Sequence, residues 1–106
     1  MKVFRFYEDG GHGWLRVTFL ELMGLGIEKD ISHYSYIKPS KDGKTIYCYL
    51  EEDCDLERFA VAMNAKGKEW KARRYASDRS RIRSYDSYSV VLKTMDNFNY
   101  FKGETL

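Results

Sequence analysis

Alternating apolar and polar side chains predict a β-strand over Thr45–Glu52. Successive side chains of a strand point to opposite faces, so one face of this strand is expected to be core and the other surface. The expected core face carries Ile46, Cys48 and Leu50, and the expected surface face carries Tyr47, Tyr49 and Glu51.

A helix is predicted over residues 54–66, directly after this strand. Leu56, Phe59 and Met63 recur at the spacing of three to four residues that places apolar side chains on one side of a helix. Asp53 is expected to cap the first turn, and Gly67 to close the last turn in a left-handed conformation. The helix should therefore pack on the apolar face of the preceding strand.

The first part of the chain predicts a hairpin followed by a short helix. Lys2–Glu8 and Trp14–Thr18 both alternate, and the glycine-rich run between them supplies a turn. Thr18 and Glu21 have the spacing of a capping box, which would start a helix over about residues 19–25.

Two further strands are predicted, over Ser32–Lys38 and Glu69–Ala76. The Asp42-Gly43 pair favours a tight hairpin turn between Ser32–Lys38 and the strand at Thr45–Glu52. The resulting register pairs Ile37 with Cys48 and Tyr36 with Tyr49, and it places Tyr34, Tyr36, Tyr47 and Tyr49 on one face.

The C-terminal part gives weaker patterns. Ser77–Ser87 is polar and is predicted to be a loop. Val90–Leu92 and Phe98–Phe101 are predicted to form either a terminal hairpin or a short helix, because the pattern fits both.

Together these elements predict an α+β fold in one domain, residues 1–106. The sheet is expected to be antiparallel or mixed with about five strands, packed against the main helix over 54–66 and the short helix over 19–25. From Trp14 onward, the order strand, helix, strand, strand, helix, strand suits a split βαβ arrangement.

Composition bounds the class of protein. The 43% hydrophobic content with a single proline is typical of a folded globule. Two cysteines are too few for a disulfide scaffold, and no run approaches the roughly 20 apolar residues of a membrane span. Without an export signal at its start, the chain is expected to be soluble and cytoplasmic, with no membrane partner.

Charge is unevenly distributed along the chain. The formal net charge is +2, but Lys66–Arg83 holds eight basic residues against Glu69 and Asp78. This segment therefore carries +6 and the rest of the chain −4. Trp70 and Tyr75 are interleaved with the basic residues, a pattern that could follow a phosphate backbone while rings stack on bases.

Candidate catalytic or metal-binding groups are few. Asp9 and His12, with His33, could form an acid–base pair or a metal site, although a solvated turn explains the same residues. Cys48 and Cys54 lack the CxxC spacing of zinc sites, and a structural Cys54 is favoured over a reactive thiolate. No catalytic residue, metal or cofactor is therefore predicted.

An acidic cluster around the start of the main helix leaves several alternatives open. It could bind a divalent cation, or mimic phosphates toward a basic groove, or simply cap the helix and compensate its dipole. Capping already explains Asp53 and Asp55, whereas Glu51, Glu52 and Glu57 exceed that need.

Tyrosine is enriched at protein interfaces, and this chain has nine. The same rings could instead cover the second face of the sheet. The residues predicted to bind a partner are Tyr34, Tyr36, Tyr47, Tyr49, Glu51, Glu52, Arg73, Arg74, Arg79, Arg81 and Arg83.

Four segments of the chain are distinctive as motifs. They are GHGWLRV at residues 11–17, SHYSY at 32–36, YLEEDCDLERF at 49–59 and RIRSY at 81–85. Together they resemble a group of small proteins carried by bacteriophages and mobile elements. The resemblance covers about residues 1–85, so residues 86–106 form a C-terminal extension to it. It transfers no residue role. It implies an accessory protein in the cytoplasm of an infected or lysogenic bacterial host, where such proteins often inhibit host defences, including CRISPR nucleases.

Three functions follow as hypotheses. The first is a non-enzymatic protein that binds and modulates or inhibits a host protein or protein–nucleic acid complex, as an anti-CRISPR inhibitor would. The second is direct nucleic-acid binding by the basic segment 66–83. The third is a small enzyme or ligand-binding protein that uses His12. The oligomeric state stays open.

Overall fold

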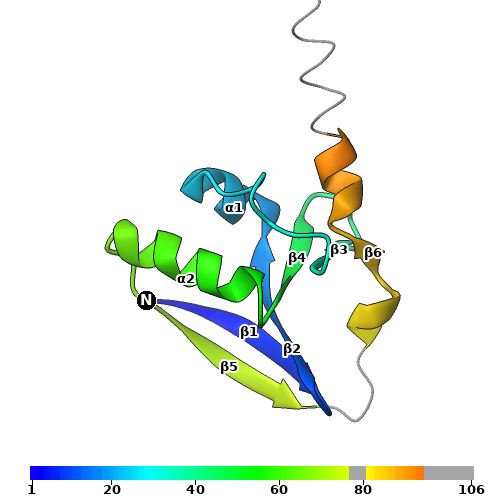
Figure 1. The fold of residues 1–106 in the computed structure, drawn as a ribbon, viewed down its shortest axis with the longest axis horizontal. Coiled ribbons are helices and arrows are strands. Elements are labelled where there is room, and N and C mark those ends of the chain that lie inside the picture. The colour runs from blue at the N-terminus through cyan, green and yellow to red at the C-terminus, as the bar shows by residue number, and fades with distance from the viewer. Residues whose placement is uncertain (77–80, 95–106) are drawn as a thin grey trace, which may run out of the picture.

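A computed structural model describes residues 1–76 and 81–94, and within them the chain forms an α+β fold (Figure 1). The strands are β1 (Lys2–Asp9), β2 (His12–Thr18), β3 (Tyr36–Pro39), β4 (Ile46–Glu51), β5 (Trp70–Ala76) and β6 (Asp86–Ser87). The helices are α1 (Phe19–Leu25), α2 (Asp55–Ala65) and the short 3-10 helix η1 (Arg81–Ser84). Residues 89–94 are also helical.

The described strands make one mixed sheet of six strands in the order β5-β1-β2-β4-β3-β6. Every neighbouring pair is antiparallel except β1 and β5, which are parallel. The split βαβ arrangement predicted from Trp14 onward is modified, because β1 lies between β2 and β5. The chain therefore crosses from β4 to β5 over two intervening strands, with α2 in the connection.

Both longer helices cover the same face of the sheet (Figure 1). The Phe4 ring meets the Phe59 ring edge-on, with their centres 5.2 Å apart, and both rings contact Trp70. The buried residues of this core are Phe4, Phe6, Leu15, Val17, Leu22, Ile31, Ile37, Cys48, Leu50, Phe59, Met63 and Tyr88. The predicted packing of the main helix on its own strand is confirmed.

Several local predictions are confirmed because their signals lie within a few residues. Thr18 and Glu21 form the predicted capping box at the start of α1. The hairpin between β3 and β4 pairs Ile37 with Cys48, as expected from the turn. Gly67 has a φ of 65°, the left-handed conformation that closes α2.

Two predictions near α2 are wrong. Asp53 does not cap the helix, since the N-cap is Cys54, whose amide donates to Glu51 Oε2 at 3.0 Å. β3 begins at Tyr36 rather than at Ser32. The reason is Asp55, whose buried carboxylate accepts hydrogen bonds from the Ser32 amide at 3.0 Å and the Ser32 hydroxyl at 2.7 Å. These side-chain bonds draw the backbone into a turn.

The predicted loop over 77–87 is also wrong in its described part, because it contains η1 and β6. After β6, Tyr88 is fully buried in the core and its hydroxyl donates to the Glu28 carbonyl. Val90–Leu92 is helical, while Phe98–Phe101 lies outside the described residues. The described part of the extension thus packs on the same sheet as the rest of the chain.

Candidate functional site

The face of the sheet opposite α1 and α2 gathers tyrosine and basic side chains. We call it the aromatic–basic face and define it as Arg5, Tyr7, Arg16, Tyr36, Lys38, Tyr47, Lys71, Arg73 and Tyr75. Strand alternation explains the set, because the alternate residues of the same strands enter the core. Register aligns the set across strands, since Arg5 pairs with Arg73 and Tyr7 with Tyr75.

Rings and cations contact one another across this face. The Tyr7 and Tyr75 rings stack, with centres 5.5 Å apart and planes 26° apart. The Arg16 guanidinium lies 4.3 Å from the centre of the Tyr47 ring. The Arg5 guanidinium donates to the Tyr7 hydroxyl at 3.3 Å, and this hydrogen bond raises the pKa of Arg5. The cations are thus held among π-surfaces.

The cations of the aromatic–basic face have no carboxylate partner in residues 1–76 and 81–94. The ion pairs there join Lys2 to Glu21, Arg74 to Glu8 and Arg83 to Asp9. None of them involves Arg5, Arg16, Lys38, Lys71 or Arg73. Five positive charges therefore face solvent without internal compensation, which favours an anionic partner.

One segment covers part of the sheet on this side. Ile82 of η1 is buried against Trp14 and Tyr49, and Tyr85 packs on the Tyr49 ring at 5.2 Å between centres. The Arg83 guanidinium donates to Asp9 Oδ1 at 2.9 Å and ties η1 to the β1–β2 hairpin. Under Ile82 and Tyr85, the Tyr49 side chain is only 7% exposed, and this burial raises the pKa of Tyr49 to about 12.

The predicted partner-binding tyrosines occupy different environments. Tyr36 and Tyr47 are half-buried on the aromatic–basic face. Tyr49 lies under η1 and is not available to a partner in this arrangement. Tyr34 is 57% exposed, but it precedes β3, and its ring lies tilted against the His33 ring rather than joining the sheet.

The charged residues that were predicted to bind a partner also lie in different parts of the structure. Arg73 lies on the aromatic–basic face, whereas Arg74 points to the other face, over the Phe6 ring. Arg81 is exposed on η1 and Arg83 pairs with Asp9, while Arg79 lies outside the described residues. Glu51 is half-buried and accepts from Cys54, and Glu52 is exposed after β4.

Sequence reasoning missed most of the basic set. Arg5, Arg16, Lys38 and Tyr7 were not singled out, whereas Lys71 and Tyr75 belong to the basic segment that was proposed to bind nucleic acid. Alternation alone would have placed Arg5 and Tyr7 on the solvent side of their strand. What the sequence lacked was the pairing of β1 with β5, which brings the two basic strands together.

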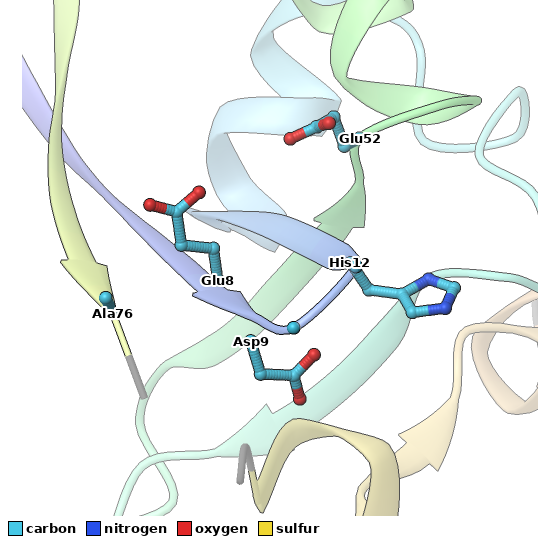
Figure 2. Close-up of a pocket in the computed structure, with 7 residues that line it drawn as sticks. Glu8, Asp9, His12, Glu52 and Ala76 are labelled. Atoms are coloured by element: carbon cyan, nitrogen blue, oxygen red, sulfur yellow. The ribbon is translucent and has the colours of Figure 1, made fainter. Parts of the chain in front are cut away.

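His12 lines an open hollow of about 740 Å³ together with Glu8, Asp9 and Glu52 (Figure 2). Figure 2 shows the His12 ring pointing away from the Glu8 carboxylate. Asp9 is engaged by Arg83, and the His12 ring stacks on Trp14 at 6.1 Å between centres. In the described part of the chain, His12 therefore has no carboxylate hydrogen-bonded to it, and the arrangement does not form an acid–base pair.

The other candidate groups are structural. Burial raises the pKa of the Cys48 thiol to about 12, which disfavours a thiolate. Desolvation and the neighbouring Glu51 carboxylate raise the pKa of Cys54. Asp55, from the acidic cluster, is buried and bonded to Ser32 and Ser35. Among residues 1–76 and 81–94, no group of three His, Cys, Asp or Glu side chains could hold a metal ion.

No protein-family model, curated protein or solved structure matches this chain. The resemblance to phage and mobile-element proteins therefore stays a prediction. Over the described residues, no helix is long and apolar enough to cross a membrane.

Proposed function

We propose that this protein is a non-enzymatic binding protein whose aromatic–basic face binds single-stranded nucleic acid. The observation that carries the proposal is the set of five cations without carboxylate partners, interleaved with tyrosine rings on one face of the sheet. Guanidinium and ammonium groups would contact phosphates, and the rings would stack on bases.

Geometry favours a single strand over a duplex. The bases of a duplex are stacked on one another, so a tyrosine ring cannot reach their faces without unstacking them. A single strand presents its bases freely, and base–aromatic stacking contributes roughly 1–3 kcal/mol per base. Tyr75 is 39% exposed and stacked on Tyr7, which gives an open ring surface of this kind.

The test is a fluorescence anisotropy titration with labelled single-stranded and duplex oligonucleotides at low salt. We expect the single strand to bind more tightly, with affinity that falls steeply as salt rises. Reversing two charges in Arg5→Glu with Arg73→Glu should abolish binding. The matched control is Lys29→Glu with Lys44→Glu, which makes the same change in net charge away from this face. Equal loss in both variants, or no binding by the original chain at low salt, would refute the proposal.

A second candidate is a modulator or inhibitor of a host macromolecule, the role implied by the resemblance to phage proteins. Exposed Tyr34, Glu52 and Asp53 lie outside the aromatic–basic face and combine a ring with carboxylates. That combination suits a basic protein surface, including one that normally binds nucleic acid. Affinity purification of tagged protein from a bacterial host tests this candidate, because inhibition requires a stable complex that Tyr34→Ala with Asp53→Asn weakens.

A further inference from the structure

Three arginines lie side by side on the aromatic–basic face, at matching positions of three neighbouring strands. Arg5 of β1 pairs with Arg73 of β5 on one side and with Arg16 of β2 on the other. We call this set the arginine row. Adjacent strands lie roughly 4.8 Å apart, so the outer two Cα atoms of the row are separated by roughly 10 Å. Because arginine side chains are long and flexible, all three guanidinium groups can reach one small anion above the row.

The arginine row is unfavourable without an anion. Like charges placed directly opposite each other on neighbouring strands destabilise a sheet. In the part of the chain that the structure describes, none of the three arginines forms an ion pair with a carboxylate. Arg5 and Arg73 are exposed and Arg16 is half-buried, so the row is open to solvent. This arrangement favours a compact anion that carries more than one negative charge.

The arginine row is open at one end and closed at the other. At the open end, β5 is the last of the described strands on that side of the sheet (Figure 1). At the other end, Arg16 pairs with Tyr49 of β4, and Tyr49 lies beneath Ile82 and Tyr85. A nucleic-acid strand that enters along the row from β5 therefore meets this cover directly after the third arginine. A row of this kind suits the end of a strand better than a strand that continues past it.

Aromatic rings flank the arginine row on both sides. The stacked rings of Tyr7 and Tyr75 lie on one side, and the Arg5 guanidinium is 5.7 Å from the centre of the Tyr75 ring. On the opposite side, the Tyr47 ring lies 4.3 Å from the Arg16 guanidinium. A base attached to a phosphate on the row can thus stack on a neighbouring ring.

We propose that the arginine row binds the terminal phosphate of a single strand, so that the protein recognises a phosphorylated strand end. The inference rests on the proposed function, because the rest of the strand binds the same face. A terminal phosphate monoester has three non-bridging oxygens and a charge of about −1.5 to −2 at neutral pH. A diester inside the strand has two such oxygens and a single charge. Guanidinium groups bind phosphate oxygens through paired, charge-assisted hydrogen bonds, so three of them match a monoester better than a diester.

The test is a set of competition titrations at neutral pH, in which unlabelled oligonucleotides displace a labelled single strand. The competitors are 12-nucleotide oligo-dT with a 5′-phosphate, with a 3′-phosphate, or with hydroxyl groups at both ends. We expect one phosphorylated form to bind at least about tenfold more tightly than the hydroxyl form, and the arm that does so identifies the end. The control for charge is a 14-nucleotide oligo-dT with hydroxyl ends, whose two extra diesters supply about the charge of one monoester. It should gain no more than about twofold.

Arg5→Lys with Arg16→Lys separates the geometry of the row from its charge. Lysine keeps the positive charge but lacks the planar fork of donors, so the preference for the phosphorylated end should fall below about twofold. This preference is a ratio of two affinities of the same variant, so a general loss of binding does not imitate it. Lys71→Ala is the matched control, because Lys71 lies on the same face outside the row. It should weaken all the strands alike and keep the end preference.

The possible failures are distinguishable. If the phosphorylated strands bind no better than the 14-nucleotide strand, the strand-end site is refuted and the proposed function stands. An end preference that survives in Arg5→Lys with Arg16→Lys would place the phosphate elsewhere and overturn the role of the row. If no oligonucleotide binds, the proposed function itself fails. Displacement of the phosphorylated strand by inorganic phosphate at the same concentration as the oligonucleotide would overturn the proposal in favour of a free-phosphate site.

Discussion

The Arg16 guanidinium lies 4.3 Å from the centre of the Tyr47 ring, and no carboxylate in the described part of the chain pairs with it. The two residues come from neighbouring strands, β2 and β4. One face of the Tyr47 ring is thus held by a cation, and the half-buried side chain keeps an outer surface. Such a pair places a fixed positive charge beside a fixed aromatic ring. Under the proposed function, the charge would contact a phosphate and the ring would stack on a base.

Truncating this platform should weaken binding without changing the charge. Tyr47→Ala is expected to lower affinity for a single-stranded oligonucleotide roughly 5- to 100-fold, because one stacking contact is lost. Tyr47→Phe keeps the ring and should bind within about twofold of the original chain. Anisotropy titrations measure both variants, and circular dichroism checks that both are folded. Equal affinities of the alanine and phenylalanine variants would argue against stacking at this position.

Salt dependence tests the cations as a group. If each of the five unpaired cations neutralises one phosphate, the slope of log K against log salt concentration should be roughly −3.5 for a single strand. Lys71→Ala should make the slope less steep by about 0.7. Lys44→Ala, in the turn between β3 and β4, is the matched control and should leave the slope unchanged. A slope near zero would mean that phosphates are not what this face binds.

The α+β class was predictable because its signals are local. In β4, Cys48 and Leu50 alternate with tyrosines, and the Thr18–Glu21 capping box lies within four residues. Neither signal needs knowledge of a partner strand. Hydrophobic burial then selects which face turns inward, as the alternation implies.

The parts that could not be predicted depend on distant residues. The parallel pairing of β1 and β5 joins segments more than 60 positions apart. The residue pattern of each strand predicts a strand, but it does not specify which other strand pairs with it. This parallel pairing brings Arg5 and Tyr7 beside Arg73 and Tyr75. The members of the aromatic–basic face that were anticipated are therefore those of the basic segment and the tyrosines of the β3–β4 hairpin, and the members that were not anticipated are Arg5, Tyr7, Arg16 and Lys38. The late start of β3, at Tyr36 rather than at the predicted Ser32, has the same origin, because the carboxylate that binds the Ser32 amide belongs to Asp55 of α2.

Asp55 should be a stability determinant rather than a binding residue. Its carboxylate is fully buried and accepts from the Ser32 amide, the Ser32 hydroxyl and the Ser35 hydroxyl. Asp55→Ala leaves these donors without an acceptor, so we expect the free energy of unfolding to fall by something on the order of 3 kcal/mol. Asp55→Asn keeps one acceptor oxygen and should lose about half as much. Urea unfolding measures both, and a loss below about 1 kcal/mol in the alanine variant would contradict this role.

Tyr49 should make the fold sensitive to alkaline pH. Burial under η1 raises its pKa to about 12, whereas a tyrosine in the unfolded chain ionises near pH 10. Between these values the unfolded state releases the proton and the folded state keeps it, so unfolding becomes more favourable as pH rises. The contribution of Tyr49 is therefore fully present below about pH 10 and lost progressively toward pH 12.

Tyr49→Phe removes the ionisable hydroxyl and keeps the ring, so it isolates this effect. We expect the free energy of unfolding of the original chain to fall by roughly 2 kcal/mol more than that of the variant between pH 9 and pH 12. Urea unfolding at stepped pH values gives both curves. Tyr85→Phe is the control, because Tyr85 is only half-buried and lies on the outer side of the same contact. If the original chain and Tyr49→Phe lose stability in parallel, the Tyr49 hydroxyl is not buried under η1 in solution, and the cover over this part of the sheet is open.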